Sequence, residues 1–162
     1  MSRTIYLAIV ITTLTCLAPL RAQGSGSSPL FAGGRLLQGD TLRSGDGCVE
    51  LRFLFADGYY TRLDLRGTGG PGCATPNWDS YSDFDWQGIG RGLHESSNEP
   101  RGMRAAAAFM QGDGNFVVYD LETGTPVWAT HTDGHPGAWL HVQGDGNMVI
   151  YSAGNEALWS LF

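Results

Sequence analysis

The sequence FMQGDGNFVVY at residues 109–119 returns almost unchanged as HVQGDGNMVIY at residues 141–151. Repetition at a fixed period of about 20–50 residues indicates an architecture of stacked or radially arranged units. Each copy has a polar half containing Gln, Asp and Asn, followed by an apolar half that ends in Tyr. We therefore expect two equivalent structural units in this part of the chain.

Five residues of each copy occupy alternate positions, so an extended chain places them on one face. They are Gln111, Asp113, Asn115, Val117 and Tyr119 in the first copy, and Gln143, Asp145, Asn147, Val149 and Tyr151 in the second. Phe116 and Val118 fall on the opposite face. The Asp-Gly pair is a strong hairpin signal, and a three-residue loop ending on a left-handed Gly114 would return Gln111 beside Asn115. The pattern predicts a hairpin that displays polar groups around a valine.

The side chains of this face suit a polyol. A sugar hydroxyl both donates and accepts hydrogen bonds, and Asp, Asn and Gln together supply acceptors and donors. Valine methyl groups can contact the C–H face of a sugar ring, and Tyr adds a hydroxyl and a shielding ring. These residues provide no set of nucleophile, base and oxyanion donor. They predict carbohydrate binding without metal, cofactor or enzymatic turnover.

The rest of the sequence favours an all-β domain. Short β-type runs are separated by turns rich in Gly, Asp and Asn, which is typical of a sandwich, barrel or prism. The runs span residues 51–55, 59–65, 116–120, 126–130, 138–142 and 148–152. The alanines at 105–108 favour a helix by propensity. However, they occupy the slot of residues 138–140 in the next copy, so we expect a strand there.

Charge limits the class of partner. The formal net charge is −6, and all ten basic residues are Arg. A nucleic-acid interface needs a clustered basic stripe, and the sequence contains none. We expect no nucleic-acid partner.

Residues 1–22 have the parts of a secretory signal peptide: Arg3, an apolar stretch over residues 5–20, and Ala22 at the cleavage position. The apolar stretch is interrupted by threonines and is shorter than the roughly 20 residues of a membrane-spanning helix. We expect cleavage, no membrane span in the mature chain, and a secreted location, extracellular or periplasmic. Residues 23–32 read as a flexible Gly/Ser leader, and residues 33–162 as one domain.

Cysteine usage agrees with an oxidising destination. Cleavage of the signal removes Cys16 and leaves Cys48 and Cys73. Paired thiols in an oxidising compartment normally form a bridge. We predict one disulfide between Cys48 and Cys73.

The Q-x-D-x-N-x-V-x-Y phrase, followed by the Trp-Ala-Thr strand at residues 128–130, resembles the bulb-type, or monocot mannose-binding, lectin family. The resemblance is strong over residues 105–160 and weaker over residues 35–65. It implies the β-prism II fold, in which three antiparallel sheets surround a pseudo-threefold axis. It also implies that Gln, Asp, Asn and Tyr of each phrase hydrogen-bond mannose while Val contacts the ring.

The resemblance further implies a third copy, for which residues 55–63, FADGYYTRL, are the best candidate. There Phe55, Tyr59, Thr61 and Leu63 replace the Gln, Asn, Val and Tyr of the other copies. The polar face is lost, so this copy should be silent. A register one residue different would return the apolar residues to the inner face, and this alternative stays open. The spacing between this copy and the next is longer than one repeat. It predicts an insertion within residues 66–104.

Several other residues could act as sugar platforms or metal ligands, but each has a simpler structural interpretation. Trp128 and Trp159 end equivalent stretches and are expected in the core. The Asp-Gly-Asn turns lack the ligand number of a calcium loop. His131 and His135 have the spacing of a helical zinc pair, but Gly and Pro nearby forbid the helix, so both should be solvated.

The sequence thus predicts a secreted, non-enzymatic lectin for mannose-containing glycans. The main rival is a β-prism that serves only as a scaffold for protein–protein interaction, as in a secreted toxin or adhesion component. A hydrolase would need a carboxylate pair, for which Asp83 and Asp85 near Trp86 are the only hint. A homodimer stays open. Relatives often exchange a C-terminal strand, whereas this chain ends three residues beyond Trp159.

Overall fold

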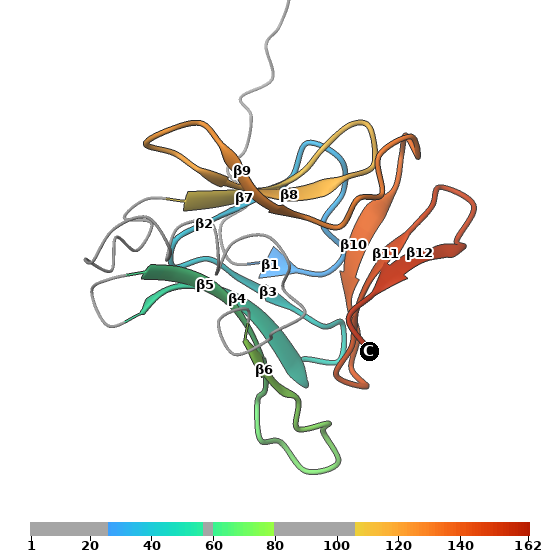
Figure 1. Cartoon of the computed structure of the whole chain (residues 1–162). Coiled ribbons are helices and arrows are strands. Elements are labelled where there is room, and N and C mark those ends of the chain that lie inside the picture. Colours follow the sequence, from blue (N-terminus) through green and yellow to red (C-terminus); the bar gives the residue numbers. More distant parts are fainter. Residues whose placement is uncertain (1–25, 57–59, 80–105) are drawn as a thin grey trace, which may run out of the picture.

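The computed structural model describes residues 26–56, 60–79 and 106–162. The signal sequence predicted over residues 1–22 therefore lies outside the described residues, as do Asp83, Asp85 and Trp86. The described ranges contain twelve β-strands and no helix. Accordingly, they include no helical segment with the length and apolar character needed to span a bilayer. Figure 1 shows the strands gathered into three sheets that form the sides of a prism, as predicted.

The first sheet has the strand order β1-β3-β4-β5-β6. Its strands are β1 (Gly26–Ser27), β3 (Thr41–Arg43), β4 (Val49–Ala56), β5 (Tyr60–Gly67) and β6 (Asn77–Asp79). The long β4–β5 hairpin forms its centre, and β6 comes from the predicted insertion. All pairs are antiparallel except β1 with β3, which is parallel. The predicted antiparallel arrangement therefore holds for this sheet apart from the short strand at its edge.

The other two sheets contain the two copies of the repeated phrase. The second sheet has the order β2-β7-β8-β9, with β2 (Arg35–Leu37), β7 (Ala106–Met110), β8 (Phe116–Asp120) and β9 (Pro126–Ala129). The third has the order β10-β11-β12, with β10 (Trp139–Val142), β11 (Met148–Tyr151) and β12 (Ala157–Ser160). The alanine run is a strand, as predicted, because each inner alanine faces the core.

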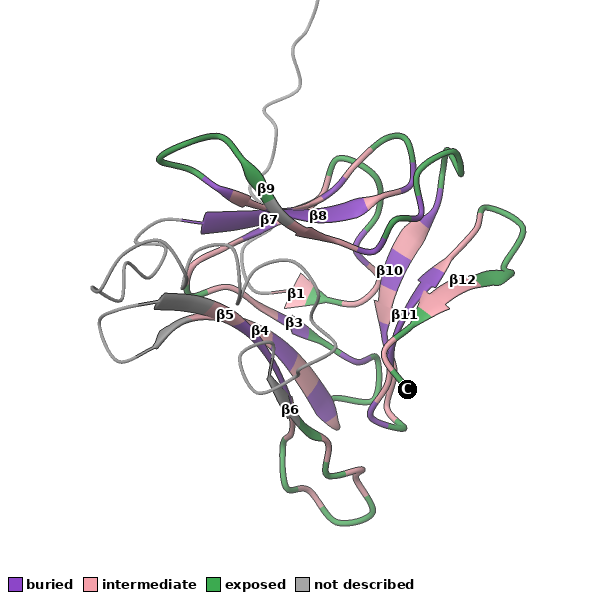
Figure 2. Cartoon of the chain, viewed as in Figure 1, coloured by how far each residue is buried: buried purple, intermediate pink, exposed green. Residues whose placement is uncertain are grey.

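The core lies between the three sheets, where their inner faces meet. Phe116, Val118 and their counterparts Met148 and Ile150 are almost fully buried. Figure 2 shows buried residues alternating with half-buried ones along β10, as expected when one sheet face packs inward. Trp128 and Trp159 pack against this core and against each other, with ring centroids 5.8 Å apart. The prediction that both are core residues is confirmed.

Part of the expected flexible leader is ordered. Residues 23–32 were expected to be mobile, but Gly26–Ser27 form β1 and Leu30 is fully buried in the core. The Leu30 backbone pairs with Leu140, and Ser28 Oγ accepts a hydrogen bond from Val142 N–H at 2.8 Å. Burial of the Leu30 side chain and pairing of its backbone stabilise this segment, although its Gly/Ser-rich composition favours a flexible chain. The domain therefore begins earlier than residue 33.

The first repeat has the alternative register. The last cross-strand pair of its hairpin is Ala56 with Tyr60, and Leu63 is fully buried. The alignment that placed Leu63 in the position of Tyr119 is therefore wrong by one residue. Burial explains the shift, since a slip by one would move every leucine of β5 to the outer face.

Candidate functional site

Both copies of the repeated phrase form the predicted hairpin. In the second sheet, Gln111 N–H donates to Asn115 O at 2.8 Å, and Gly114 has φ +99°. In the third sheet, Gln143 N–H donates to Asn147 O at 2.9 Å, and the equivalent glycine has φ +98°. The left-handed glycine reverses the chain over three residues, so the start and the end of each phrase lie side by side.

The aspartates order these loops. Asp113 Oδ1 accepts the backbone N–H of Asn115 at 3.0 Å, and Asp145 Oδ1 accepts that of Asn147 at the same distance. Both aspartates are exposed. One oxygen of each carboxylate holds the turn, and Oδ2 is left to accept from a ligand.

Glutamine and tyrosine are joined across each hairpin. Gln111 Nε2 donates to the Tyr119 hydroxyl at 2.8 Å, and Gln143 Nε2 donates to the Tyr151 hydroxyl at 2.7 Å. Each tyrosine keeps its own proton for donation, and each glutamine keeps its carbonyl oxygen for acceptance. Val117 and Val149 are 2% and 3% exposed, so only a small part of each side chain reaches the surface.

The two asparagines differ in their contacts. Asn115 Oδ1 accepts from Thr130 Oγ1 at 3.1 Å, and within the described part of the chain its Nδ2 group has no partner. Asn147 Nδ2 donates to the Phe162 carbonyl at 3.1 Å, and its Oδ1 accepts Phe162 N–H at 3.2 Å. A primary amide has two N–H donors, so one remains on Asn147. The second-sheet site therefore offers more donor capacity.

The second-sheet hairpin rests on the segment that leads to β10. Thr132 Oγ1 donates to Gly114 O at 2.7 Å, and His135 N–H donates to Asp113 O at 2.9 Å. Thr130 and Thr132 are buried and hydrogen-bonded to each other. The Trp-Ala-Thr strand contains Thr130, but no sequence pattern marks either threonine as a support for the hairpin.

The third-sheet hairpin rests on a loop of the first repeat instead. The Asp46 carboxylate fills the space where a Gly144 side chain would stand, and Pro76 lies against Gly146. Asp46 Oδ1 accepts from Ser44 Oγ at 2.6 Å and from Cys48 N–H at 2.9 Å. These hydrogen bonds stabilise the charged form and lower the pKa of Asp46.

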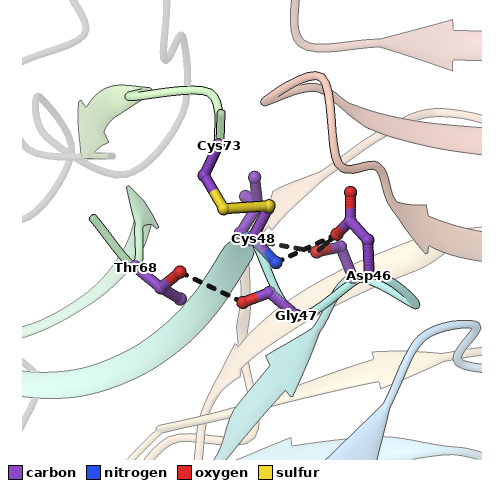
Figure 3. Close-up of a disulfide and its surroundings, with 7 residues drawn as sticks. Asp46, Gly47, Cys48, Thr68 and Cys73 are labelled. Carbon is purple, nitrogen blue, oxygen red and sulfur yellow. Dashed lines mark hydrogen bonds between the residues drawn. A yellow bond between two sulfur atoms is a disulfide. The ribbon is translucent and has the colours of Figure 1, made fainter. Parts of the chain in front are cut away.

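The predicted disulfide ties this loop together. Cys48 and Cys73 are bridged, and Figure 3 shows the bond beside Asp46 and Gly47. Thr68 Oγ1 donates to Gly47 O at 3.1 Å across the same loop. The disulfide thus fixes the segments that carry Asp46 and Pro76 under the third-sheet hairpin.

The first sheet carries ion pairs in place of a site. Its outer face has Arg62 and Asp64 at the positions of Val117 and Tyr119. The Asp64 side chain is completely buried and pairs with Arg52 and with Arg66, the latter at 2.7 Å. The prediction that the first repeat lacks the polar set is consistent with these charged replacements.

The ten predicted site residues therefore form two separate groups on two sheets. His131 and His135 are exposed loop residues, as expected. Across residues 26–56, 60–79 and 106–162, no three His, Cys, Asp or Glu side chains are grouped so as to hold a metal ion.

Comparison with known proteins gives matches at the level of structure. No protein-family model and no curated protein sequence matches the chain. A Japanese Marasmius oreades lectin has 28% identity and a TM-score of 0.56, covering 84% of this chain and 91% of its own. The mannose-specific agglutinin from snowdrop (Galanthus nivalis) bulbs, complexed with methyl-α-D-mannoside, has 25% identity and a TM-score of 0.51, covering 77% and 89%.

A monomeric monocot mannose-binding lectin from Gastrodia elata shares the fold, with 24% identity, a TM-score of 0.52, and coverage of 82% of this chain and 94% of its own. The prism of three sheets, the paired hairpins and these similarities lead to one assignment. The chain has the β-prism II fold and is similar over most of its length to bulb-type lectins of known structure.

Proposed function

We propose that the protein is a lectin that binds terminal mannose through the second-sheet and third-sheet hairpins, without a metal ion and without turnover. The observation that carries the proposal is the matching side-chain order of the two hairpins. In both, Gln is bonded to Tyr and Asp is bonded to the backbone of Asn. The similarity to the mannose-specific snowdrop agglutinin, complexed with methyl-α-D-mannoside, supports mannose as the sugar.

The arrangement can satisfy vicinal hydroxyl groups. The free carboxylate oxygen of Asp113 accepts a hydroxyl proton, and the free Nδ2 group of Asn115 donates to a hydroxyl oxygen. The Tyr119 hydroxyl donates to a further sugar oxygen while Gln111 holds it in place. Because these groups are already oriented by the protein, binding costs little ordering of side chains.

Calorimetry with methyl α-mannoside at millimolar concentration tests the proposal. We expect two sites per chain, Asn115→Ala to remove the second-sheet site, and Asn147→Ala to remove the third-sheet site. An unpaired polar group costs about 1–3 kcal/mol, roughly a tenfold or greater loss in affinity. Asn77→Ala, at an exposed position of the first sheet, is the matched control and should leave both sites unchanged.

Tyr119→Phe and Tyr151→Phe remove only a hydroxyl group and serve if an alanine variant folds poorly. Three sites in the unchanged protein, or mannoside binding by the double Asn variant, would show that the binding face lies elsewhere. Binding should also survive EDTA, because every proposed ligand group is a side chain. Loss of binding on chelation, with recovery on adding Ca²⁺, would contradict the metal-free part of the proposal.

The scaffold alternative is favoured by one observation, the replacement of the first-sheet site by buried ion pairs. A glycan array separates the two functions. A lectin should bind mannose-terminated glycans in preference to others, whereas a scaffold should show no selective glycan signal.

We also propose that the protein is secreted. The support is the signal-like sequence of residues 1–22 together with the Cys48–Cys73 disulfide. Mass spectrometry of protein from the medium or periplasm should give a chain starting at Gln23 with no free thiol. Alkylation of both cysteines without reduction would contradict an oxidising destination.

A further inference from the structure

Aromatic side chains gather beside the third-sheet hairpin, on the outer face of β10. Trp139 is paired across the strands with Tyr151, and His141 is paired with Val149. Tyr151 and Val149 belong to the proposed mannose site. Trp139 and His141 therefore lie directly beside this site, on the neighbouring strand and on the same outer face of the sheet.

The rings are in mutual contact. Trp139 stacks on Tyr151 with ring centroids 5.0 Å apart and planes 26° apart, and it lies 5.3 Å from His141. Phe31 extends the group on the other side, with its ring 6.2 Å from Trp139. We call Phe31, Trp139, His141 and Tyr151 the aromatic shelf.

The aromatic shelf is not part of the core. The core residues of β10 are Leu140 and Val142, which are fully buried on the inner face, whereas Trp139 and His141 are half-buried and Phe31 is 58% exposed. Within the described residues, Trp139 Nε1 and the His141 ring nitrogens have no hydrogen-bond partner. The shelf thus presents both ring surface and polar edges to solvent.

The second sheet has a smaller aromatic group at the equivalent place, in which Phe109 meets Tyr119 edge-on with ring centroids 5.9 Å apart. Ala107 occupies the position of Trp139, paired with Tyr119, and Phe109 occupies the position of His141. Ala107 is fully buried and offers no ring surface. The chain therefore offers an internal comparison between one hairpin with a ring stacked on its Tyr, Trp139 on Tyr151, and one with Ala107 at that position.

We propose that the aromatic shelf is a subsite for a second hexose ring, glycosidically linked to the mannose held by the third-sheet hairpin. Residues diagonal across two paired strands are about 7–8 Å apart, so Trp139 lies about one sugar ring away from Val149. An aromatic surface packs against the C–H face of a pyranose, and the free ring nitrogens can bond its hydroxyls. This inference rests on the proposed function. It predicts that the third-sheet site prefers an oligosaccharide, whereas the second-sheet site recognises one monosaccharide.

The test measures each site alone in the full-length mature protein. Asn115→Ala leaves the third-sheet site, and Asn147→Ala leaves the second-sheet site. Calorimetry with methyl α-mannoside and with methyl α-linked dimannosides gives the preference for the disaccharide at each. We expect the third-sheet site to prefer at least one dimannoside by about tenfold, equal to about 1.4 kcal/mol, and the second-sheet site to show almost none.

Trp139→Ala in the Asn115→Ala background should reduce that preference to about one. Trp139→Phe keeps an aromatic ring and should retain most of the preference, whereas Trp139→Leu, which is apolar but not aromatic, should lose it. Near-ultraviolet circular dichroism establishes that each variant is folded. If Trp139→Ala is unfolded, the disaccharide preference of Trp139→Phe compared with that of Trp139→Leu tests the proposal.

The outcomes separate the two proposals. Absence of mannoside binding at both sites overturns the proposed function itself. Mannoside binding at both sites with equal preference for the disaccharide overturns the shelf only. A homodimer that dissociates on Trp139→Ala, seen by light scattering, also overturns the shelf as a sugar subsite, because a second copy would then cover it.

Discussion

Gly114 and Gly112 belong to the same hairpin but have different surroundings. Gly114 has φ +99°, and a Cβ atom there would lie 2.2 Å from the His135 carbonyl oxygen. Gly112 has no atom within 4 Å of such a Cβ. The two glycines therefore differ: Gly114 is both left-handed and closely packed, whereas Gly112 has open space around it.

We expect Gly114→Ala to lower the free energy of unfolding by about 3 kcal/mol, because it combines backbone strain with a clash against backbone atoms. Gly112→Ala is the matched control and should change it by less than about 0.5 kcal/mol. Urea denaturation of both variants measures the difference. Equal stabilities would show that the hairpin relaxes without cost.

At the scale of elements, each binding hairpin depends on a different neighbour. The second-sheet hairpin is supported by Thr132 and His135, close in sequence, and the third-sheet hairpin by Asp46 and Pro76, which lie on the two segments joined by the disulfide. The disulfide is therefore coupled to one site and not to the other.

Replacing both Cys48 and Cys73 with Ser should lower the free energy of unfolding by about 3 kcal/mol. It should also weaken mannoside binding at the third-sheet site more than at the second-sheet site, because only the former rests on Asp46 and Pro76. Calorimetry in the Asn147→Ala and Asn115→Ala backgrounds, under conditions where the chain remains folded, measures each effect. A uniform loss at both sites would contradict the coupling.

The outer face of the first sheet depends on one buried carboxylate. Asp64 pairs with Arg52 and Arg66, whose side chains are 35% and 24% exposed. Removal of one partner from a buried pair leaves uncompensated charge, so Asp64→Ala should cost about 3 kcal/mol of unfolding free energy.

The matched control is Glu50→Ala, which breaks the pair with Arg43 on the same face. The Arg43 side chain is 62% exposed, so this loss should remain below about 1 kcal/mol. Thermal or urea unfolding distinguishes the two. Similar costs for both variants would mean that burial adds little to the Asp64 pairs.

At the scale of the whole molecule, the two proposed sites lie on different sides of the prism (Figure 1). If both proposed sites bind mannose, one chain bridges two glycan chains, and multivalency raises the apparent affinity. The unchanged protein should precipitate a branched mannan, and Asn115→Ala or Asn147→Ala should abolish precipitation if the protein is a monomer. Precipitation that persists in both single variants would indicate a homodimer with one site per chain, which light scattering checks directly.

The sequence by itself determined the fold class, the two hairpins and the disulfide. These features were predictable because they depend on local chemistry. Alternation in residues 111–119 specifies a strand face, and Asp-Gly specifies the turn. The two cysteines outside the expected signal sequence predict one bridge in an oxidising compartment.

Only the tertiary structure decided the features that depend on packing between distant segments. Burial of Leu63 set the register of the first repeat, and burial of Leu30 brought part of the expected leader into the domain. Asp46 and Pro76 reach the third-sheet hairpin, and Phe31 reaches Trp139, across long separations in sequence. No periodicity encodes such contacts, because they arise when three sheets close around one core and bring unrelated loops together.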